Sequence, residues 1–305
     1  MSIKVLIIGT GAVGSVYGAK LSQAGAKVSV LCRSDYETVN KNGIQVQSIL
    51  GDHYFRPEHT LKAGQTYPQK ADLVLVTTKV LPEINIPHLI APYIHPQTTI
   101  LLLQNGIFIE PPIQAAFPNN EILSGLSFIC ATRTAYGQVQ HIDYGRLAIG
   151  KYPNGSSTIA TALAELFDAV QIPTKRSDTI QKERWKKLVW NAPFNPLSVI
   201  SGGMDTQSLL KEPQYRKQIH TIMTEVCACA AADNHPLHES IIEKNIQDTE
   251  KMTPYKTSML IDFESGRPLE TEAIIGNVVR FAESQNVQVP EIKAMYKKLL
   301  TLSDR

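Results

Sequence analysis

The sequence predicts an α/β protein in which a mostly parallel, doubly wound sheet is followed by a helical domain. Near the N-terminus an apolar run, a glycine-rich turn, a helical segment and a second apolar run come in that order. Strand-like runs then alternate with helical segments as far as about residue 173, where the strand signals stop. We therefore predict an N-terminal Rossmann-type doubly wound sheet over residues 1–173 and a C-terminal all-helical domain over residues 174–305.

The first strand and the turn after it carry the most specific signal in the chain. The apolar run of residues 3–8 leads directly into Gly9-Thr10-Gly11-Ala12-Val13-Gly14, which has G-x-G-x-x-G spacing. In a dinucleotide-binding unit the first glycine permits a tight turn, the second lets the backbone approach a pyrophosphate, and the third lets the helix pack closely on the strand. The phosphates lie at the positive end of that helix.

The surroundings of this turn strengthen the prediction of a dinucleotide site. Residues 15–24 have the apolar and small residues of a helix packed on a sheet, and Gly25 can end that helix in a left-handed conformation. Residues 28–32 form the next apolar run. We therefore expect Gly9 to Gly14 to contact the cofactor.

Later segments continue the pattern and then change it. Buried-strand runs at 72–77, 99–103 and 122–127 are expected to extend the parallel sheet, and residues 128–152 are expected to add antiparallel strands. The helical domain is predicted from segments 180–189, 215–232, 237–251, 271–285 and 290–300. A nucleotide domain followed by a helical domain predicts a substrate cleft between the two.

Composition excludes several classes of function. The net charge is +2 with no long Lys/Arg run, so no nucleic-acid partner is expected. No apolar stretch reaches the roughly 18 residues that a membrane span needs. The first strand begins by residue 3, which leaves no room for a signal peptide. The four cysteines and eight histidines have no metal-ligand spacing, so we expect a cytoplasmic protein with free thiols and no metal. A homodimer is compatible with the helical domain.

The end of the second strand bears on the choice of cofactor. An acidic residue at this point accepts hydrogen bonds from the ribose 2′-hydroxyl of NAD. Here Arg33 lies 19 residues after Gly14, where that acid is expected, and a guanidinium there can pair with a 2′-phosphate. Asp35, two residues further on, is the alternative and would serve NAD. We predict NADPH.

Two strand ends and one helix carry candidate polar residues. Lys79 and Asn105 follow the third and fourth parallel strands, at the edge where such sheets bind ligands. On a helix, Lys187, Asn191 and Asn195 are four residues apart and share one face. Spacing alone leaves two interpretations of that face: the lining of a ligand site, or a solvated basic surface.

Taken together, the motifs resemble one family over nearly the whole chain. They are Gly9-x-Gly11-Ala12-Val13-Gly14, Lys79, Gln104-Asn105-Gly106, Lys187-Leu188-x-x-Asn191-x-x-x-Asn195-Pro196-Leu197, Ser258-Met259-Leu260-x-Asp262 and Gly266-Arg267-x-x-Glu270. This ordered set resembles the ketopantoate reductases. The resemblance implies NADPH-dependent reduction of the 2-keto acid 2-dehydropantoate (ketopantoate) to (R)-pantoate, in the biosynthesis of pantothenate.

The same resemblance implies roles for individual residues. Lys187 is implied to be the general acid, and Glu270 to lie near it, holding a substrate hydroxyl or a cofactor group. Hydride addition creates an alkoxide, which an adjacent ammonium can stabilise and protonate. The remaining implied contacts are Asn191, Asn195 and Ser258 with substrate, Asn105 with substrate and cofactor, and the backbone of Ala131 with the cofactor.

Some positions leave alternatives open. Lys186 competes with Lys187, Glu272 competes with Glu270, and Pro193 is expected to kink the helix between the two asparagines. A further substrate asparagine of the family corresponds either to Asp205 or to a position lost within residues 201–204, and Asp205 would repel a carboxylate unless turned away. The alternative functions are the same chemistry on another 2-keto acid and, from a different class, a non-catalytic NADPH-binding sensor.

Overall fold

The computed structural model describes residues 2–303, which form two compact units. The first unit comprises Met1–Lys79, Ile84–Gln104 and Glu110–Ile180, and the second Val80–Glu83, Asn105–Ile109 and Gln181–Arg305. The main division between these compact units comes after Ile180, and the domain boundary after residue 173 stays a prediction from the sequence. Residues 174–176 form a short strand that pairs with the sheet, which keeps them in the first unit.

The first unit contains one ten-stranded sheet. Its strands are β1 (Lys4–Ile8), β2 (Lys27–Cys32), β3 (Ile44–Ser48), β4 (His53–Phe55), β5 (Thr60–Lys62), β6 (Leu73–Val76), β7 (Thr99–Leu102), β8 (Ile122–Ala135), β9 (Gln138–Lys151) and β10 (Thr174–Arg176). Its helices are α1 (Ala12–Gln23), α2 (Tyr36–Asn42), α3 (Ile86–Ile90), the short 3₁₀ segment η1 (Ala91–Tyr93), α4 (Pro111–Ala116) and α5 (Thr158–Ala169).

The strand order explains where a nucleotide can bind. Strands β5-β2-β1-β6-β7-β8 are parallel neighbours in that order, so the direction of winding reverses between β1 and β6. This is the doubly wound arrangement, in which ligands bind beyond the carboxyl ends of the strands at the reversal. The long β8–β9 pair is antiparallel, as predicted for residues 128–152, and β3 and β4 extend the sheet beyond β9.

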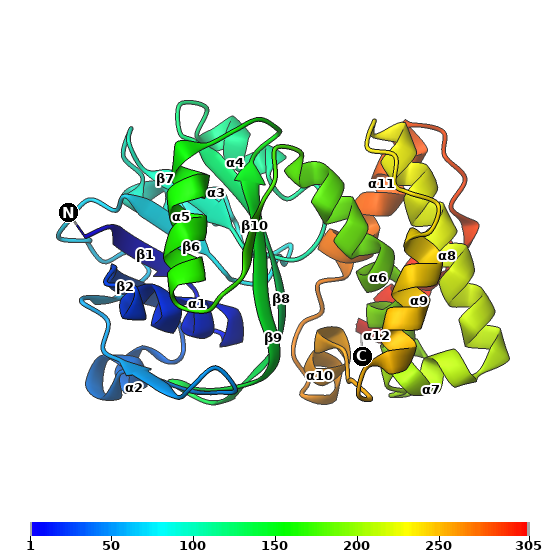
Figure 1. Ribbon diagram of the computed structural model, residues 1–305, viewed down its shortest axis with the longest axis horizontal. Helices are drawn as coiled ribbons and strands as arrows, with labels where there is room; N and C mark the ends of the chain where they lie inside the picture. Colours follow the sequence, from blue (N-terminus) through cyan, green and yellow to red (C-terminus); the bar gives the residue numbers. More distant parts are fainter. Residues whose placement is uncertain (1, 304–305) are drawn as a thin grey trace. The chain divides into compact units, whose positions relative to one another are not determined.

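The core of the first unit lies between the sheet and helices α1 and α5, which pack against each other and over the sheet (Figure 1). The strand residues of β1, β6 and β7 are almost wholly buried, as expected for parallel strands covered by helices. Tyr17 of α1 meets Phe167 of α5 edge to face, with ring centroids 5.8 Å apart. This packing fixes the start of α1, which follows the glycine turn.

The second unit is all-helical over its described residues. It contains α6 (Ile180–Ile200), α7 (Thr206–Lys211), α8 (Pro213–Ala232), α9 (Ile241–Lys251), α10 (Ser258–Glu264), a π-helical segment η2 (Glu272–Gly276), α11 (Asn277–Ser284) and α12 (Pro290–Ser303). In the described part of the chain no helix is long and apolar enough to cross a membrane. Residues 2–303 also hold no group of three or more His, Cys, Asp or Glu side chains that could bind a metal.

Helix α6 is the central element of this unit and is longer than its sequence predicts. The periodic pattern indicated a helix over 180–189, yet α6 continues for 21 residues through Pro193 and Pro196. Each proline removes one backbone donor. The helix persists because its later residues fill the core: Ala192 and Phe194 are fully buried, and Leu197 is nearly so.

Candidate active site

The centre of the site is a contact between Lys187 and Asn105 within the helical unit. Lys187 lies on α6, and its Nζ donates a hydrogen bond to Oδ1 of Asn105 at 2.8 Å. The two residues are 82 positions apart, and they meet because the loop 105–109 belongs to the helical unit. Only the fold could show that these two candidates are partners.

The loop that carries Asn105 is held by the π-helical segment. The Ile107 amide donates to the Ala273 carbonyl at 3.0 Å, and Asn277 Nδ2 donates to the Ile107 carbonyl at 2.7 Å. Gly106 has a φ of +99°, and a Cβ there would lie 2.5 Å from the Ala273 carbonyl oxygen. Glycine is therefore required at this position, because a side chain would push the loop off the helix. The Gln104-Asn105-Gly106 motif thus has a structural basis.

The electrostatic surroundings of Lys187 favour proton transfer near neutral pH. Removal from water lowers the pKa of Lys187 to about 7, and the positive charge of Arg184 contributes to this change. The Glu270 carboxylate acts in the opposite direction and favours the ammonium form. Glu270 is itself held by the backbone, because its Oε1 accepts a hydrogen bond from the Val80 amide at 2.9 Å.

Asn191 and Asn195 lie further along the same helix as Lys187. Asn191 is 7% exposed and Asn195 is 2% exposed, so this face of α6 is not a solvated basic surface. Buried amide side chains require hydrogen-bonding partners. They therefore suit a lining of polar groups for a bound molecule.

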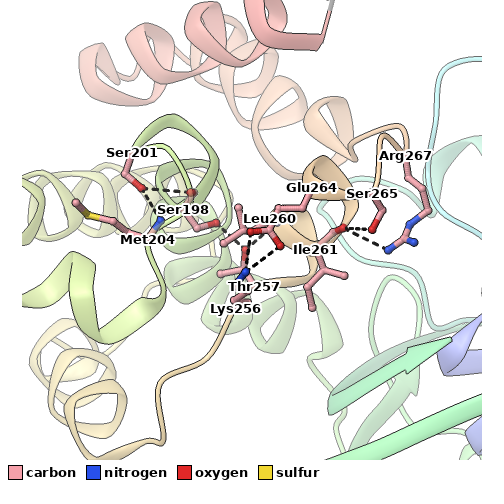
Figure 2. A network of polar contacts seen from close by, with 10 residues as sticks. All are labelled: Ser198, Ser201, Met204, Lys256, Thr257, Leu260, Ile261, Glu264, Ser265 and Arg267. Carbon is pink, nitrogen blue, oxygen red and sulfur yellow. Dashed lines mark hydrogen bonds and ion pairs between the residues drawn. The ribbon is translucent and has the colours of Figure 1, made fainter. Parts of the chain in front are cut away.

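A hydrogen-bond network between α6 and α10 includes Thr257, the residue before Ser258 (Figure 2). The hydroxyl groups of Ser198 and Thr257 lie 2.7 Å apart, and the Ser198 hydroxyl also donates to the Asn195 carbonyl at 2.7 Å. Thr257 caps α10 by accepting from the Leu260 amide at 3.1 Å. Ser258, the first residue of α10, is exposed, and the network fixes the start of its helix relative to α6.

The predicted dinucleotide turn in the first unit has the expected local geometry. Gly9 has a φ of +101°, and a Cβ on Gly14 would lie 2.2 Å from the Gly9 carbonyl oxygen and 2.5 Å from Oγ1 of Thr77. A Cβ on Gly11 would meet nothing within 4 Å. Gly11 stands at the N-cap of α1 with no side chain capping the helix. The first backbone amide groups of α1 therefore have no side-chain cap, and the space beside Gly11 is open. This arrangement fits a pyrophosphate.

The charged residues after β2 distinguish the two candidates for ribose recognition. Arg33 is exposed. Asp35 is 2% exposed; its carboxylate accepts hydrogen bonds from the Thr10 hydroxyl and, at 3.3 Å, from the Arg33 amide, and it lies 3.8 Å from the Arg133 guanidinium. Asp35 is therefore turned inward, with its oxygens occupied, whereas Arg33 is exposed after the end of β2.

The two other predicted cofactor residues also lie in the first unit. Lys79 comes three residues after the end of β6, a strand that adjoins the point where the winding reverses. Ala131 lies in β8, opposite His141 of β9, next to one of the register irregularities of that pair. Both residues are partly accessible.

Comparisons with known proteins decide the family. A sequence model described as "Ketopantoate reductase PanE/ApbA" matches residues 5–154, and its C-terminal counterpart matches residues 179–302. A 2-dehydropantoate 2-reductase from Nostoc sp. strain PCC 7120 is 36% identical, with 99% of this chain and 96% of the relative covered. The chain belongs to the ketopantoate reductase family.

Solved structures of ketopantoate reductases have the same fold over their full length. The 2-dehydropantoate 2-reductase of Methylococcus capsulatus is 47% identical with a TM-score of 0.92, covering 98% of this chain and 97% of that one. The enzyme of Geobacter metallireducens GS-15 is 32% identical, also with a TM-score of 0.92, covering 98% and 99%. Ketopantoate reductases are NADPH-dependent oxidoreductases, and the exposed Arg33 and open glycine turn of this chain fit that cofactor.

The structure accounts for the competing residues that the sequence left open. Lys186 Nζ is paired with Glu183 at 2.9 Å. Glu272 is engaged by Arg280 and by the Tyr296 hydroxyl, each at 2.6 Å. Asp205 caps α7, because its Oδ1 accepts a hydrogen bond from the Ser208 amide at 2.7 Å. The Asp205 carboxylate therefore has a structural role at the start of this helix.

Three residues around this ketopantoate reductase site were not predicted from the sequence. Arg184 is 1% exposed and donates to the Gly106 carbonyl at 3.0 Å, while Val80 and Asn277 hold Glu270 and the 105–109 loop. An arginine three residues before Lys187 was visible as a signal, because positions i and i+3 share a helix face. The other two contacts depend on backbone proximity, for which the sequence carries no signal.

Proposed function

We propose that this chain catalyses the NADPH-dependent reduction of 2-dehydropantoate to (R)-pantoate, with Lys187 as the general acid. One observation carries the proposal: in a member of the ketopantoate reductase family, an ammonium with a pKa of about 7 is hydrogen-bonded to Asn105. An acid whose pKa lies near the working pH is best suited to transfer a proton in the transition state.

The reaction requires a proton donor beside the keto oxygen. NADPH supplies a hydride to the keto carbon, and the carbonyl oxygen gains negative charge as that bond forms. The Lys187 ammonium stabilises this charge and gives up its proton to the oxygen, which leaves a hydroxyl group and a neutral amine. Asn105 orients the Lys187 amine through its 2.8 Å hydrogen bond. Glu270 favours the charged form of Lys187 before each turnover.

The substrate presents a carboxylate, a keto oxygen and a terminal hydroxyl group. Asn191, Asn195 and Ser258 are neutral hydrogen-bonding groups, and we assign them to these oxygens. Neutral donors can bind a carboxylate without placing another positive charge next to the Lys187 ammonium. A further positive charge there would lower the pKa of Lys187 again. The burial of both asparagines supports this assignment.

We assign cofactor binding to the N-terminal domain that the sequence predicts, residues 1–173. We assign substrate binding to the predicted C-terminal domain, residues 174–305. The assigned cofactor contacts are Gly9, Thr10, Gly11, Ala12, Val13, Gly14, Arg33, Lys79, Asn105 and Ala131. The inward position of Asp35 supports NADPH over NADH, because its carboxylate is buried and already accepts hydrogen bonds from Thr10 and the Arg33 amide.

We further propose a cytoplasmic location and a homodimer. Cys32, Cys227 and Cys229 are free thiols, as is typical of proteins in a reducing compartment. In the helical unit Phe263 and Leu300 are partly exposed apolar side chains that a second copy could cover. Light scattering on the purified protein will measure a mass of two chains if the dimer forms.

The proposal is tested with Lys187→Met and a panel of 2-keto acids. We expect the wild type to oxidise NADPH fastest with 2-dehydropantoate, and Lys187→Met to lose several orders of magnitude in kcat while its Kd for NADPH stays unchanged. Lys186→Met is the matched control and should keep its activity. A higher kcat/KM with another 2-keto acid would assign that substrate instead. Tight NADPH binding without oxidation by any keto acid would favour the sensor.

A further inference from the structure

Helix α6 carries a buried cation that the proposed mechanism does not use. Arg184 is among the largest fully buried side chains of the chain, at 1% exposed, and it lies three residues before Lys187. A guanidinium keeps its charge even when buried, and its burial is costly unless hydrogen bonds or opposite charges compensate it. Arg184 donates to the Gly106 carbonyl at 3.0 Å and shares a helix face with Lys187.

We propose that Arg184 is a positioning residue for the general acid: it fixes the loop that presents Asn105 and places a permanent positive charge one helical turn from the Lys187 ammonium. This inference rests on the proposed function of Lys187. It assigns to Arg184 a role in the proton-transfer step without any contact with substrate.

The first part of the proposal follows from how the loop is anchored. The Arg184 Nη1 donates to the carbonyl of Gly106 at 3.0 Å, and Gly106 directly follows Asn105. On its other side the loop is fixed by the Ile107 amide and carbonyl, bonded to Ala273 and Asn277. Gly106 packs so closely on the π-helical segment that a Cβ there would lie 2.5 Å from the Ala273 carbonyl oxygen, and the Arg184 bond holds the other side of the peptide next to Asn105.

The second part follows from the charges that act on Lys187. Removal from water is the largest cause of the lowered pKa of Lys187, and among the described residues Arg184 from α6 and Glu270 from the segment before η2 act on it by charge. Asn105, from the loop, contributes a neutral oxygen. Arg184 disfavours the ammonium and adds to the effect of desolvation, whereas Glu270 favours the ammonium. Without the charge of Arg184, the amine would therefore hold its proton more tightly.

The experiment separates the charge of Arg184 from its hydrogen bond. Arg184→Gln removes the charge and keeps a donor for the Gly106 carbonyl, whereas Arg184→Lys keeps the charge. The Lys187 amine is titrated directly by NMR in protein labelled with ¹⁵N-lysine, its signal being identified by its absence in Lys187→Met. We expect Arg184→Gln to raise the pKa of Lys187 by about one unit, and Arg184→Lys to leave it close to the wild-type value.

The pH profile of the reaction is the second measurement. The fall in kcat at high pH should move upward with the pKa of Lys187 in Arg184→Gln, which a purely structural residue would not cause. Arg216→Gln, at an exposed arginine paired with Glu250 in the same unit, is the control and should change neither measurement. If Arg184→Gln does not fold, Arg184→Met replaces it, because methionine fills the space without a charge.

The outcomes are distinguishable. An unchanged Lys187 titration in a folded, uncharged variant would overturn the charge role of Arg184. An unchanged kcat in Arg184→Met, which has no donor for the Gly106 carbonyl, would overturn the role of Arg184 in placing Asn105. A shifted titration with an unmoved pH profile would instead overturn Lys187 as the general acid, while the effect of Arg184 on the amine would stand.

Discussion

The pH dependence of the two reaction directions tests Lys187 most directly. Reduction requires the ammonium, and the reverse oxidation of pantoate requires the neutral amine as the base. We expect the kcat/KM for reduction to fall and the kcat/KM for oxidation to rise as the pH passes through about 7, because that is the value to which desolvation and Arg184 lower the pKa of Lys187 in the free enzyme. The opposite signs come from one group acting in two protonation states.

The size of the effect follows from the pKa. With a pKa of about 7, half of the lysine is protonated at that pH and roughly one tenth is protonated one unit higher. The rate of reduction should therefore fall about tenfold per pH unit above pH 8. A lysine with its ordinary pKa of 10.5 would give a flat profile over the same range.

Steady-state measurements of NADPH absorbance in both directions between pH 6 and about 9.5 provide the assay, with the keto acid or hydroxy acid varied so that kcat/KM is compared. Solvent deuterium isotope effects on the falling limb will show whether a proton moves in the rate-limiting step. A profile for reduction that stays flat to pH 9 in a folded, cofactor-saturated enzyme would refute this reasoning. So would two profiles of the same sign.

Three further predictions concern single substitutions. Glu270→Gln removes the carboxylate that favours the ammonium, so the fall in the rate of reduction should begin at lower pH, as a kcat profile will show; an upward shift would contradict this assignment. Arg33→Ala should weaken NADPH binding by about ten- to a hundredfold with little change for NADH, measured as Kd by fluorescence; equal losses would exclude a 2′-phosphate contact. Gly14→Ala places a Cβ 2.2 Å from the Gly9 carbonyl oxygen, so it should lower the free energy of unfolding by about 1–3 kcal/mol or more. Denaturant unfolding measures this change, and an unchanged free energy would contradict the close packing.

The sheet was predictable where buried apolar runs stand beside glycine turns. Strands β1, β2, β6 and β7 were found to within one or two residues for this reason. Strands β4, β5 and β10 have three residues each, and β10 is Thr-Lys-Arg, without any apolar signal. Such strands form because a neighbouring strand offers unpaired backbone groups. The local sequence does not show where that neighbouring strand lies.

The helical unit shows a different limit of local rules. Pro193 was expected to kink the helix, and the periodic pattern ended at residue 189, yet the burial of Phe194 and its neighbours outweighs two missing backbone hydrogen bonds. Helix spacing pointed to Lys187, Asn191 and Asn195, and the family resemblance pointed to the other helical-domain candidates. Their partnerships were not, because Lys187 and Asn105 meet across 82 residues, and Glu270 is held by the backbone of Val80, 190 residues away.

The assignment of residues 80–83 and 105–109 to the helical unit has a consequence for recombining these proteins. A chimaera cut once near residue 180 would join the helices of one parent to the Asn105 loop of another. Its Ile107, which belongs to the helical core, would then come from a chain that did not evolve with that core. Exchange of substrate preference between family members should therefore succeed when both short segments travel with the helices, and a single crossover should yield poorly folded protein.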